Sequence, residues 1–339
     1  MYAKWQNAVS EPFSVANGVR QGAILSPILF CLYIDVLLKR LASSRIGCHI
    51  ENIYYGALGY ADDLVLLSPS RDGLQRMLNI CERYGDEYDM RFNAGKTKCM
   101  LMSNTLYCNN IAPLRLSGHD LSWVKSFEYL GIHVTPDLKD RSDIMCKRGR
   151  FISNVNNLLC SFSTVQCNLL NKLFDSYCTS FYGCQTWSLK DSNLRKLTTA
   201  YNIALPKIWQ LPWTAHTNIV LSVAGKRSLF EVLEKRFYNL YRSMLDSDNP
   251  SVNFIVRYAQ QDRTSLIGGN IDIICKNRNI VMNDLKDLNT LHVYDSISTE
   301  EYVLGQTVRE LCLCRDNTLA LIEYSKHDIQ NLVDFLSTQ

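Results

Sequence analysis

Tyr60-Ala61-Asp62-Asp63 stands between two apolar stretches, Tyr54 to Leu58 and Leu64 to Leu67. Successive residues of a regular strand point to opposite faces, so the carboxylates of Asp62 and Asp63 can converge only where the backbone turns. The pattern therefore predicts two short strands joined by a tight turn that carries both aspartates. Carboxylate oxygens of this kind suit a hard divalent cation such as Mg²⁺.

Paired carboxylates serve phosphoryl or nucleotidyl transfer by holding two metal ions about 3.5–4 Å apart, which activate the attacking hydroxyl and stabilise the leaving pyrophosphate. A polar hairpin tip without any chemistry would have the same local sequence. A given four-residue string occurs by chance in a chain of this length with a probability on the order of 10⁻³, so the neighbouring segments have to decide between the two interpretations.

The segment before the hairpin predicts a close backbone approach followed by a helix. It reads Gly18-Val19-Arg20-Gln21-Gly22-Ala23-Ile24-Leu25-Ser26-Pro27-Ile28-Leu29-Phe30. Its glycines allow a neighbouring backbone or ligand to come close, Ser26 is a suitable N-cap, and Pro27 suits the first helical position. After the hairpin, Ser70 is the predicted cap of a second helix, whose apolar stripe has helical spacing.

Two further segments complete the pattern, Asn93-Ala94-Gly95-Lys96-Thr97-Lys98 and Tyr129-Leu130-Gly131-Ile132. In this order the four segments resemble the reverse transcriptases of non-LTR (LINE-type) retrotransposons, from the middle of the palm onward. They are similar to the family's Q-G-x-x-x-S-P, Y/F-A-D-D, N-x-x-K-T and Y-L-G segments. The resemblance covers Phe13 to Thr135 and is weaker beyond it, where Tyr182 to Trp187 is similar to the helical region that follows the polymerase in several such elements.

The resemblance implies a role for each matching residue. Asp62 and Asp63 would be the catalytic metal ligands, with Mg²⁺ or Mn²⁺ as cofactor. The implied nucleotide- and template-binding residues are Arg20, Gln21, Gly22 and Lys96, and the primer-grip-like residues are Tyr129, Leu130 and Gly131. The implied partners are an RNA template, a DNA primer and deoxynucleoside triphosphates.

The family also has fingers and a palm strand with a further catalytic aspartate before the glutamine-glycine segment, whereas the only acidic residue before Asp35 is Glu11. We therefore expect an N-terminally truncated, inactive chain whose metal site needs residues from outside it. An unpaired sheet edge at the missing strand predicts aggregation. Two alternatives stay open: a working RNA-directed DNA polymerase completed by an upstream exon or another chain, and a catalytically dead remnant that only binds RNA or RNA–DNA hybrid, or has no function.

The predicted fold class is α+β. Residues 1–135 are expected to form a partial reverse transcriptase palm, an antiparallel sheet with packed helices that also includes the primer-grip-like segment. A wide apolar stripe from Val165 to Trp187 predicts a helix bundle, so residues 136–246 are assigned to a helical thumb-like region. The polar, turn-rich segment Asp246 to Pro250 marks the start of a C-terminal helical region, residues 247–339, of unknown role.

Composition decides less than local clustering. The 339-residue chain is 47% apolar and has a formal net charge of +3, which is weak for a nucleic-acid binder. Basic residues concentrate where the family's thumb would begin, and phosphate contacts depend on such local faces. A solvated helix face is the alternative interpretation of the same charges. The predicted contacts with the nucleic-acid backbone are Arg141, Lys147, Arg148 and Arg150.

Tryptophans in the helical region allow two interpretations. Trp187, Trp209 and Trp213 could stack on bases, although aromatic side chains of a helix bundle more often belong to its core.

Thirteen cysteines without a C-x-x-C spacing indicate reduced thiols in an intracellular protein, with nucleus and cytoplasm not distinguished. No signal peptide or membrane span is predicted, because the longest apolar run, Ile28 to Leu38, is short and contains Asp35.

Overall fold

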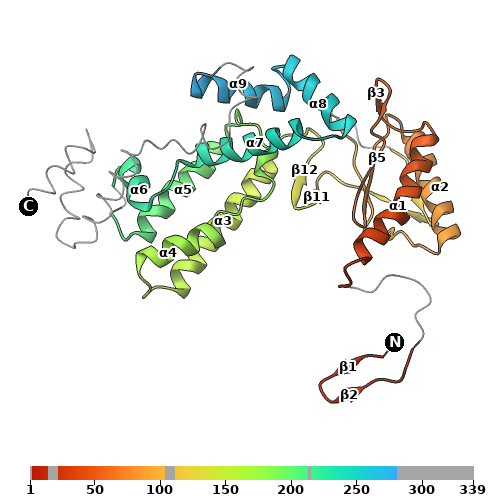
Figure 1. The fold of residues 1–339 in the computed structure, drawn as a ribbon, viewed down its shortest axis with the longest axis horizontal. Coiled ribbons are helices and arrows are strands. Elements are labelled where there is room, and N and C mark those ends of the chain that lie inside the picture. Colours follow the sequence, from red (N-terminus) through yellow and green to blue (C-terminus); the bar gives the residue numbers. More distant parts are fainter. Residues whose placement is uncertain (1, 14–21, 104–110, 213–214, 281–339) are drawn as a thin grey trace, which may run out of the picture. The chain divides into compact units, whose positions relative to one another are not determined.

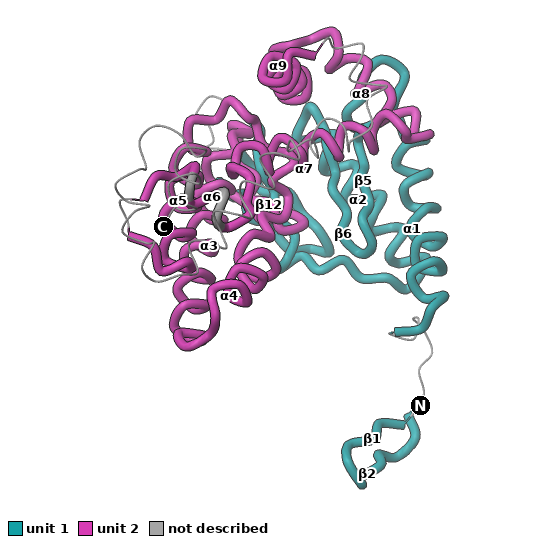
Figure 2. Tube along the Cα trace, turned by 60° about the vertical axis from the view of Figure 1, so that its left-hand side comes forward, with its two compact units in different colours: residues 1–125 teal, residues 126–339 magenta. Residues whose placement is uncertain are grey.

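The structure is a computed structural model that describes residues 2–13, 22–103, 111–212 and 215–280 (Figure 1). The chain divides into two compact units, residues 1–125 and 126–339 (Figure 2). Short strands and helices mix in the first unit and helices dominate the second, which confirms the predicted α+β class. The boundary between the units falls before the Tyr129–Ile132 segment, which the sequence-based division had grouped with residues 1–135. The assignment of residues 1–135 to a palm and of residues 136–246 to a thumb stays a prediction.

The first unit contains two long helices and ten short strands within its described residues. In chain order these are β1 (Lys4–Trp5), β2 (Ala8–Val9), α1 (Ser26–Ser43), β3 (His49–Ile50), β4 (Ile53–Tyr54), β5 (Ala57–Tyr60), β6 (Asp63–Leu66), α2 (Arg71–Tyr88), β7 (Lys98–Cys99), β8 (Arg115–Leu116), β9 (His119–Asp120) and β10 (Ser122–Trp123).

The strands of the described residues pair two by two and do not form one larger sheet. The pairs β1–β2, β3–β4, β5–β6 and β8–β9 are antiparallel hairpins, whereas β10 and β7 pair in parallel. The longest of these pairs is β5–β6, in which Ala57 lies opposite Leu66 and Tyr60 opposite Asp63. This hairpin lies along α1 in Figure 1.

Helices α1 and α2 pack against each other and against the β5–β6 hairpin. Their shared core contains Leu37, Leu41, Met77, Cys81 and Tyr84, all almost fully buried. The Tyr84 hydroxyl donates a hydrogen bond of 2.5 Å to the Tyr33 carbonyl oxygen. Apolar burial together with this polar contact fixes the two helices on one side of the hairpin.

The helix starts test two of the predictions. Ser70 caps α2 as predicted, because its side chain accepts a hydrogen bond of 3.1 Å from the backbone N–H of Gly73. The capping prediction for Ser26 is wrong by one position, since α1 begins at Ser26 itself and Leu25 occupies the N-cap position. Pro27 does lie in the first turn, where its missing N–H costs no intrahelical hydrogen bond.

The second unit begins with one hairpin and continues as helices in its described part. Its elements are β11 (Phe127–Tyr129), β12 (Ile132–Val134), α3 (Arg141–Ser161), α4 (Cys167–Leu173), the π-helical turn η1 (Phe174–Cys178), the 3₁₀ turn η2 (Cys184–Thr186), α5 (Leu194–Ile208), α6 (Thr217–Ala224), α7 (Leu229–Leu245), α8 (Pro250–Gln261) and α9 (Leu266–Arg278). Within the described ranges of both units, no helix is long and apolar enough to cross a membrane.

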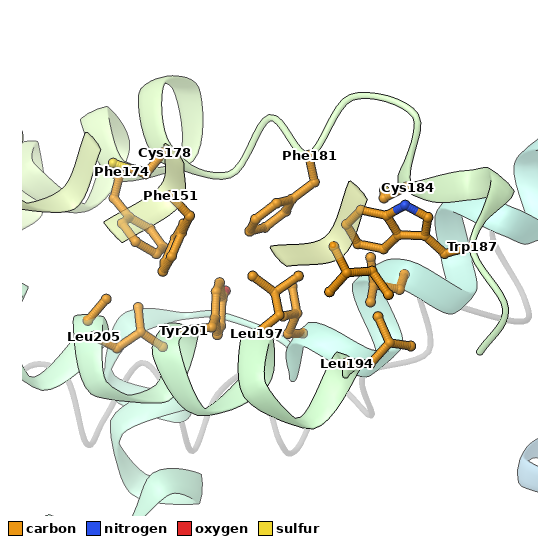
Figure 3. Close-up of a cluster of buried hydrophobic side chains, with 14 of the residues drawn as sticks. Phe151, Phe174, Cys178, Phe181, Cys184, Trp187, Leu194, Leu197, Tyr201 and Leu205 are labelled. Carbon is orange, nitrogen blue, oxygen red and sulfur yellow. The ribbon is translucent and has the colours of Figure 1, made fainter. Parts of the chain in front are cut away.

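Several aromatic side chains pack together in the core of the second unit (Figure 3). Phe151 of α3 packs edge-on against Phe174, with ring centroids 5.9 Å apart. Its ring is also stacked with that of Tyr201 in α5, with centroids 6.2 Å apart. Trp187 and Trp209 are buried in the same core. The core interpretation of these two tryptophans is therefore confirmed, while Trp213 lies outside the described residues.

Candidate active site and nucleic-acid surface

Asp62 and Asp63 lie at the tip of the β5–β6 hairpin. Ala61 and Asp62 form the connecting turn, and Asp63 is the first residue of β6. Ala61 has a positive φ of 50°, a left-handed conformation that is uncommon for a residue with a Cβ. The predicted turn is confirmed, and both carboxylates are exposed. Backbone strain of this kind often occurs at functional sites.

The alternation of side chains along the hairpin explains why this tip is polar. Leu64 and Leu66 point toward the core shared with α1 and α2. Gly59 faces the same side, since a Cβ on it would lie 3.3 Å from Cδ1 of Leu38 on α1. Because the side-chain period of a strand is two, Tyr60 and its cross-strand partner Asp63 share the opposite, outer face.

The carboxylates at the hairpin tip supply some of the oxygen ligands that one hard cation needs. Two adjacent exposed carboxylates supply oxygen ligands, and Mg²⁺ commonly binds one or two carboxylates while keeping several waters and substrate phosphates. The described residues contain no group of three or more His, Cys, Asp or Glu side chains that is arranged to hold a metal ion. Further oxygen ligands are therefore needed to complete a two-metal site.

The Asn93–Lys98 segment forms a tight turn closed by Asn93. The Asn93 carbonyl oxygen accepts hydrogen bonds from the N–H groups of Lys96 and Thr97, at 3.2 and 3.0 Å, and from the Thr97 hydroxyl at 2.8 Å. The Lys96 side chain is exposed. An open pocket of about 830 Å³ lies beside the turn and includes Lys98 and Asp120 in its lining.

Of the three predicted residues in the glutamine-glycine segment, Arg20 and Gln21 lie outside the described residues. Gly22 is exposed and has a φ of 82°, with open space where a side chain would stand. This conformation favours glycine, and it leaves room at the entrance to α1.

The Tyr129-Leu130-Gly131 segment forms the turn of the β11–β12 hairpin in the second unit. Leu130 and Gly131 both have positive φ values, 47° and 74°. Two consecutive left-handed residues are typical of the tight turns that match strand twist, and Gly131 suits this conformation while Leu130 is strained in it. Both residues are half-buried.

The predicted basic residues on α3 differ in exposure. Arg141 and Arg150 are exposed, and Arg150 Nη2 lies 3.5 Å from Oε1 of Glu128 on β11. Arg148 is half-exposed and donates through Nε to the carbonyl oxygen of Lys196, at 3.3 Å. Lys147 is only 6% exposed and pairs with Asp143. The structure therefore brings three of the four to the surface of the helix.

Asp143 is the centre of a buried polar network that sequence reasoning missed. Its carboxylate accepts hydrogen bonds from the Lys147 ammonium, from Nε1 of Trp187 at 2.7 Å and from the backbone N–H of His133 at 3.0 Å. The network joins α3 to β12 and to the segment after η2. Lys147 is four residues away on the same helix, but Trp187 and His133 lie outside α3, so the local pattern does not reveal that the pair is buried.

Asp140 extends this junction by one turn. Its Oδ2 accepts a 2.7 Å hydrogen bond from the backbone N–H of Ser188. Burial raises the pKa of the Asp140 carboxyl, although this hydrogen bond opposes the shift. The start of α3 and the segment after Trp187 are consequently held together by two neighbouring carboxylates.

Comparison with known proteins finds similarity over the first 134 residues. The family described as "Reverse transcriptase (RNA-dependent DNA polymerase)" matches residues 1–134. The chain is 44% identical over 87 residues to a "Retrovirus-related Pol polyprotein from type-2 retrotransposable element R2DM" of Drosophila melanogaster, covering 26% of this chain and 8% of that protein.

Longer and weaker similarity extends into the second unit. A "Retrovirus-related Pol polyprotein from type-1 retrotransposable element R1" of Bradysia coprophila is 27% identical over 227 residues, covering 63% of this chain and 21% of that protein. A shorter match of higher identity is to a type-1 element R2 polyprotein of Nasonia vitripennis, which is 48% identical over 67 residues. This match covers 20% of this chain and 6% of that protein. The chain thus spans about a fifth or less of the length of these relatives.

Proposed function

We propose, from the premise that residues 1–134 belong to the reverse transcriptase family of non-LTR retrotransposons, that the β5–β6 hairpin is the metal-binding site of RNA-directed DNA synthesis. The observation that carries the proposal is the position of Asp62 and Asp63, adjacent and exposed at one strained hairpin tip. The substrates are an RNA template, a DNA primer and deoxynucleoside triphosphates.

Asp62 and Asp63 would hold a divalent cation through their carboxylate oxygens, and water, phosphate and further oxygen ligands would have to complete the shell. A bound Mg²⁺ or Mn²⁺ would supply Lewis-acid chemistry for the attacking 3′-hydroxyl and the leaving pyrophosphate. Asp63 shares its face with Tyr60, so this outer face is the one turned toward substrate.

The other motif residues bind and orient substrate. Gln21 and Gly22 lie against the templating base and the incoming nucleotide, where the missing Cβ of Gly22 avoids a clash. Lys96 donates to the nucleotide's phosphates from its exposed turn. The Tyr129–Gly131 turn supports the 3′ end of the primer, and Arg141, Arg148 and Arg150 contact the nucleic-acid backbone. Lys147 is left out because its ammonium is buried. The cysteine content favours an intracellular location.

Metal binding can be measured without any activity. Tyr60 lies directly across from Asp63, so excitation of its ring should sensitise luminescence of Tb³⁺ bound at the tip. We expect the signal to fall in Asp62→Asn and Asp63→Asn and to be displaced by Mg²⁺. Glu51→Gln, which removes an exposed carboxylate from the β3–β4 turn of the same unit, is the matched control and should leave the signal unchanged.

Primer extension on an RNA template with Mg²⁺ or Mn²⁺ tests the reaction itself, using the same three variants. Extension that is lost in both aspartate variants and kept in Glu51→Gln supports the proposal. Binding of RNA–DNA hybrid without extension by any folded variant would instead support the alternative of a catalytically dead remnant. The exposed arginines of α3 favour this second candidate as a binding protein.

A further inference from the structure

Tyr182 lies against the turn of the β11–β12 hairpin. A Cβ added to Gly131 would come within 3.3 Å of both Cδ1 and Cε1 of the Tyr182 ring. The ring is nevertheless exposed, with 59% of the residue's surface accessible. An aromatic ring that covers a glycine on one side and faces solvent on the other offers a stacking surface beside the Leu130–Gly131 turn.

The segment that carries Tyr182 is interlocked with the same hairpin. Gly183 has a φ of 81°, and a Cβ on it would lie 2.8 Å from Cγ1 of Ile132. Any larger residue at this position would require the Ile132 side chain to move. Gly131 and Gly183 therefore act as a reciprocal pair, since each accommodates a side chain from the other segment.

The preceding backbone is held in an unusual conformation. Phe181 has a φ of 34°, and its ring points from the loop toward α5 in the core (Figure 3). Arg236 of α7 donates two hydrogen bonds to this loop. Its Nη1 donates to the Ser180 carbonyl oxygen, at 2.6 Å, and its Nη2 donates to the Thr179 carbonyl oxygen, at 2.9 Å. The π-helical turn η1 ends just before it, and such turns are frequent at functional sites.

The backbone is strained at Phe181, and the side chain of Tyr182, the next residue, is exposed to solvent. Phe181 alone would anchor the loop in the core, so packing does not require an exposed aromatic at the next position. Strained conformations persist where the surrounding structure holds them, often at ligand-binding sites. Arg150, whose Nη2 lies 3.5 Å from Oε1 of Glu128 on β11, adds positive charge that suits a phosphate backbone.

We infer that Tyr182 and the Leu130–Gly131 turn form one contact surface for the primer strand, with the Tyr182 ring stacking on a base or sugar. The inference rests on the proposed function for the identity of the strand. Stacking on an aromatic ring tolerates any base, because every base has a π face. Tyr182 is thus a binding residue outside the four polymerase motifs, in the segment where the family resemblance is weaker.

The test uses RNA–DNA hybrids that carry 2-aminopurine near the primer's 3′ end or at the matching template positions, because stacking quenches its fluorescence. We expect the full-length chain to quench the primer label, Tyr182→Leu to lose the quenching and bind hybrid about tenfold more weakly, and Tyr182→Phe and Tyr182→Trp to restore both. Leucine keeps an apolar cover on Gly131, so a purely structural role would not produce this difference.

Tyr177→Leu is the matched control, since Tyr177 is 53% exposed and lies five residues earlier. The inference is overturned if folded Tyr182→Leu binds and quenches as the wild-type chain does, if Tyr177→Leu has the same effect, or if only the template label responds. Failure of the proposed function looks different: Tyr182-dependent quenching of the primer label without primer extension would support this inference and count against catalysis.

Discussion

Lys147 and Asp143 form an ion pair inside the second unit, with Nζ 2.7 Å from Oδ1 and 2.5 Å from Oδ2. The two residues are four apart on α3 and therefore lie on the same face of the helix. That face is the buried one, where Asp143 also accepts a hydrogen bond from Trp187. The basic stretch of the sequence thus combines one structural lysine with arginines at the surface.

Lys147→Met should destabilise the second unit by about 3–5 kcal/mol, because it leaves the Asp143 carboxylate buried without its cation. Chemical denaturation followed by tryptophan fluorescence measures this change. Arg150→Met on the same helix is the control and should shift the free energy of unfolding by less than about 1 kcal/mol, since its partner Glu128 is exposed. Equal effects of the two substitutions would contradict the structural role of Lys147.

Arg141→Met and Arg150→Met should weaken binding of RNA–DNA hybrid through the loss of phosphate contacts. Each contact removed should lower the slope of log affinity against log salt concentration by about 0.7 to 0.9. The control is Lys276→Met on α9, whose ammonium lies 2.7 Å from Asp272 and should contribute no phosphate contact. An unchanged slope in both arginine variants would show that α3 is a solvated helix face.

Gly183→Ala should destabilise the second unit by about 2 kcal/mol, since it adds both strain at positive φ and a contact with Ile132. Gly149→Ala is the control, and we expect it to change stability in the opposite direction. Gly149 lies within α3 and has open space around its added Cβ, so alanine should stabilise the helix by about 0.5–1 kcal/mol. Thermal unfolding of both variants gives the comparison, and a gain in stability from Gly183→Ala would contradict the interlocked hairpin.

Local patterns predicted the features that depend on local chemistry. The hairpin around Asp62 followed from an apolar-acidic-apolar pattern, and the cap at Ser70 followed from a polar residue before a periodic helix. Such features are fixed by neighbours a few residues away, through strand alternation and orphan N–H groups. The exposure of Asp62 and Asp63 at the turn follows for the same reason, while their metal chemistry stays a prediction.

Features that depend on distant contacts could not be predicted. The burial of Lys147 depends on Asp143 and on Trp187, forty residues downstream, while the exposure of Tyr182 depends on the strained Phe181 beside it. Lys147 was assigned to the surface, the usual place of a lysine, and tertiary packing reversed that assignment. The exposure of Tyr182 was not predicted at all.

Buried thiols should resist alkylation far longer than exposed ones. Burial raises the pKa of Cys81 to about 12 and that of Cys178 to about 11, so almost no thiolate is present at pH 8, and the core also blocks access. Cys31 and Cys160 are exposed. Labelling with iodoacetamide, followed by mass spectrometry of each peptide, should modify these two before Cys178, and Cys81 only when denaturant is added. Early labelling of Cys81 would contradict the α1–α2 core.

The outer stripe of α1 should make the chain self-associate. Ile28, Leu32 and Val36 recur every four residues on a face that the described part of the chain leaves exposed, and Leu32 is 63% accessible. The opposite stripe, with Leu37 and Leu41, is buried, so this face is a second apolar surface and large exposed patches promote association. This helix face is therefore a second predicted cause of aggregation, beside the unpaired sheet edge expected from the sequence.

Leu32→Lys should shift the sedimentation profile toward smaller species, because a charge at the centre of the stripe opposes burial. Ile203→Lys tests whether any added charge has this effect, since Ile203 is 54% exposed on α5 but is flanked there by polar Asn202 and buried Ala204. A reduction in association by both variants would indicate a general effect of net charge. A reduction by Leu32→Lys alone would assign the association to α1, whereas no change would leave this helix face without a role in it.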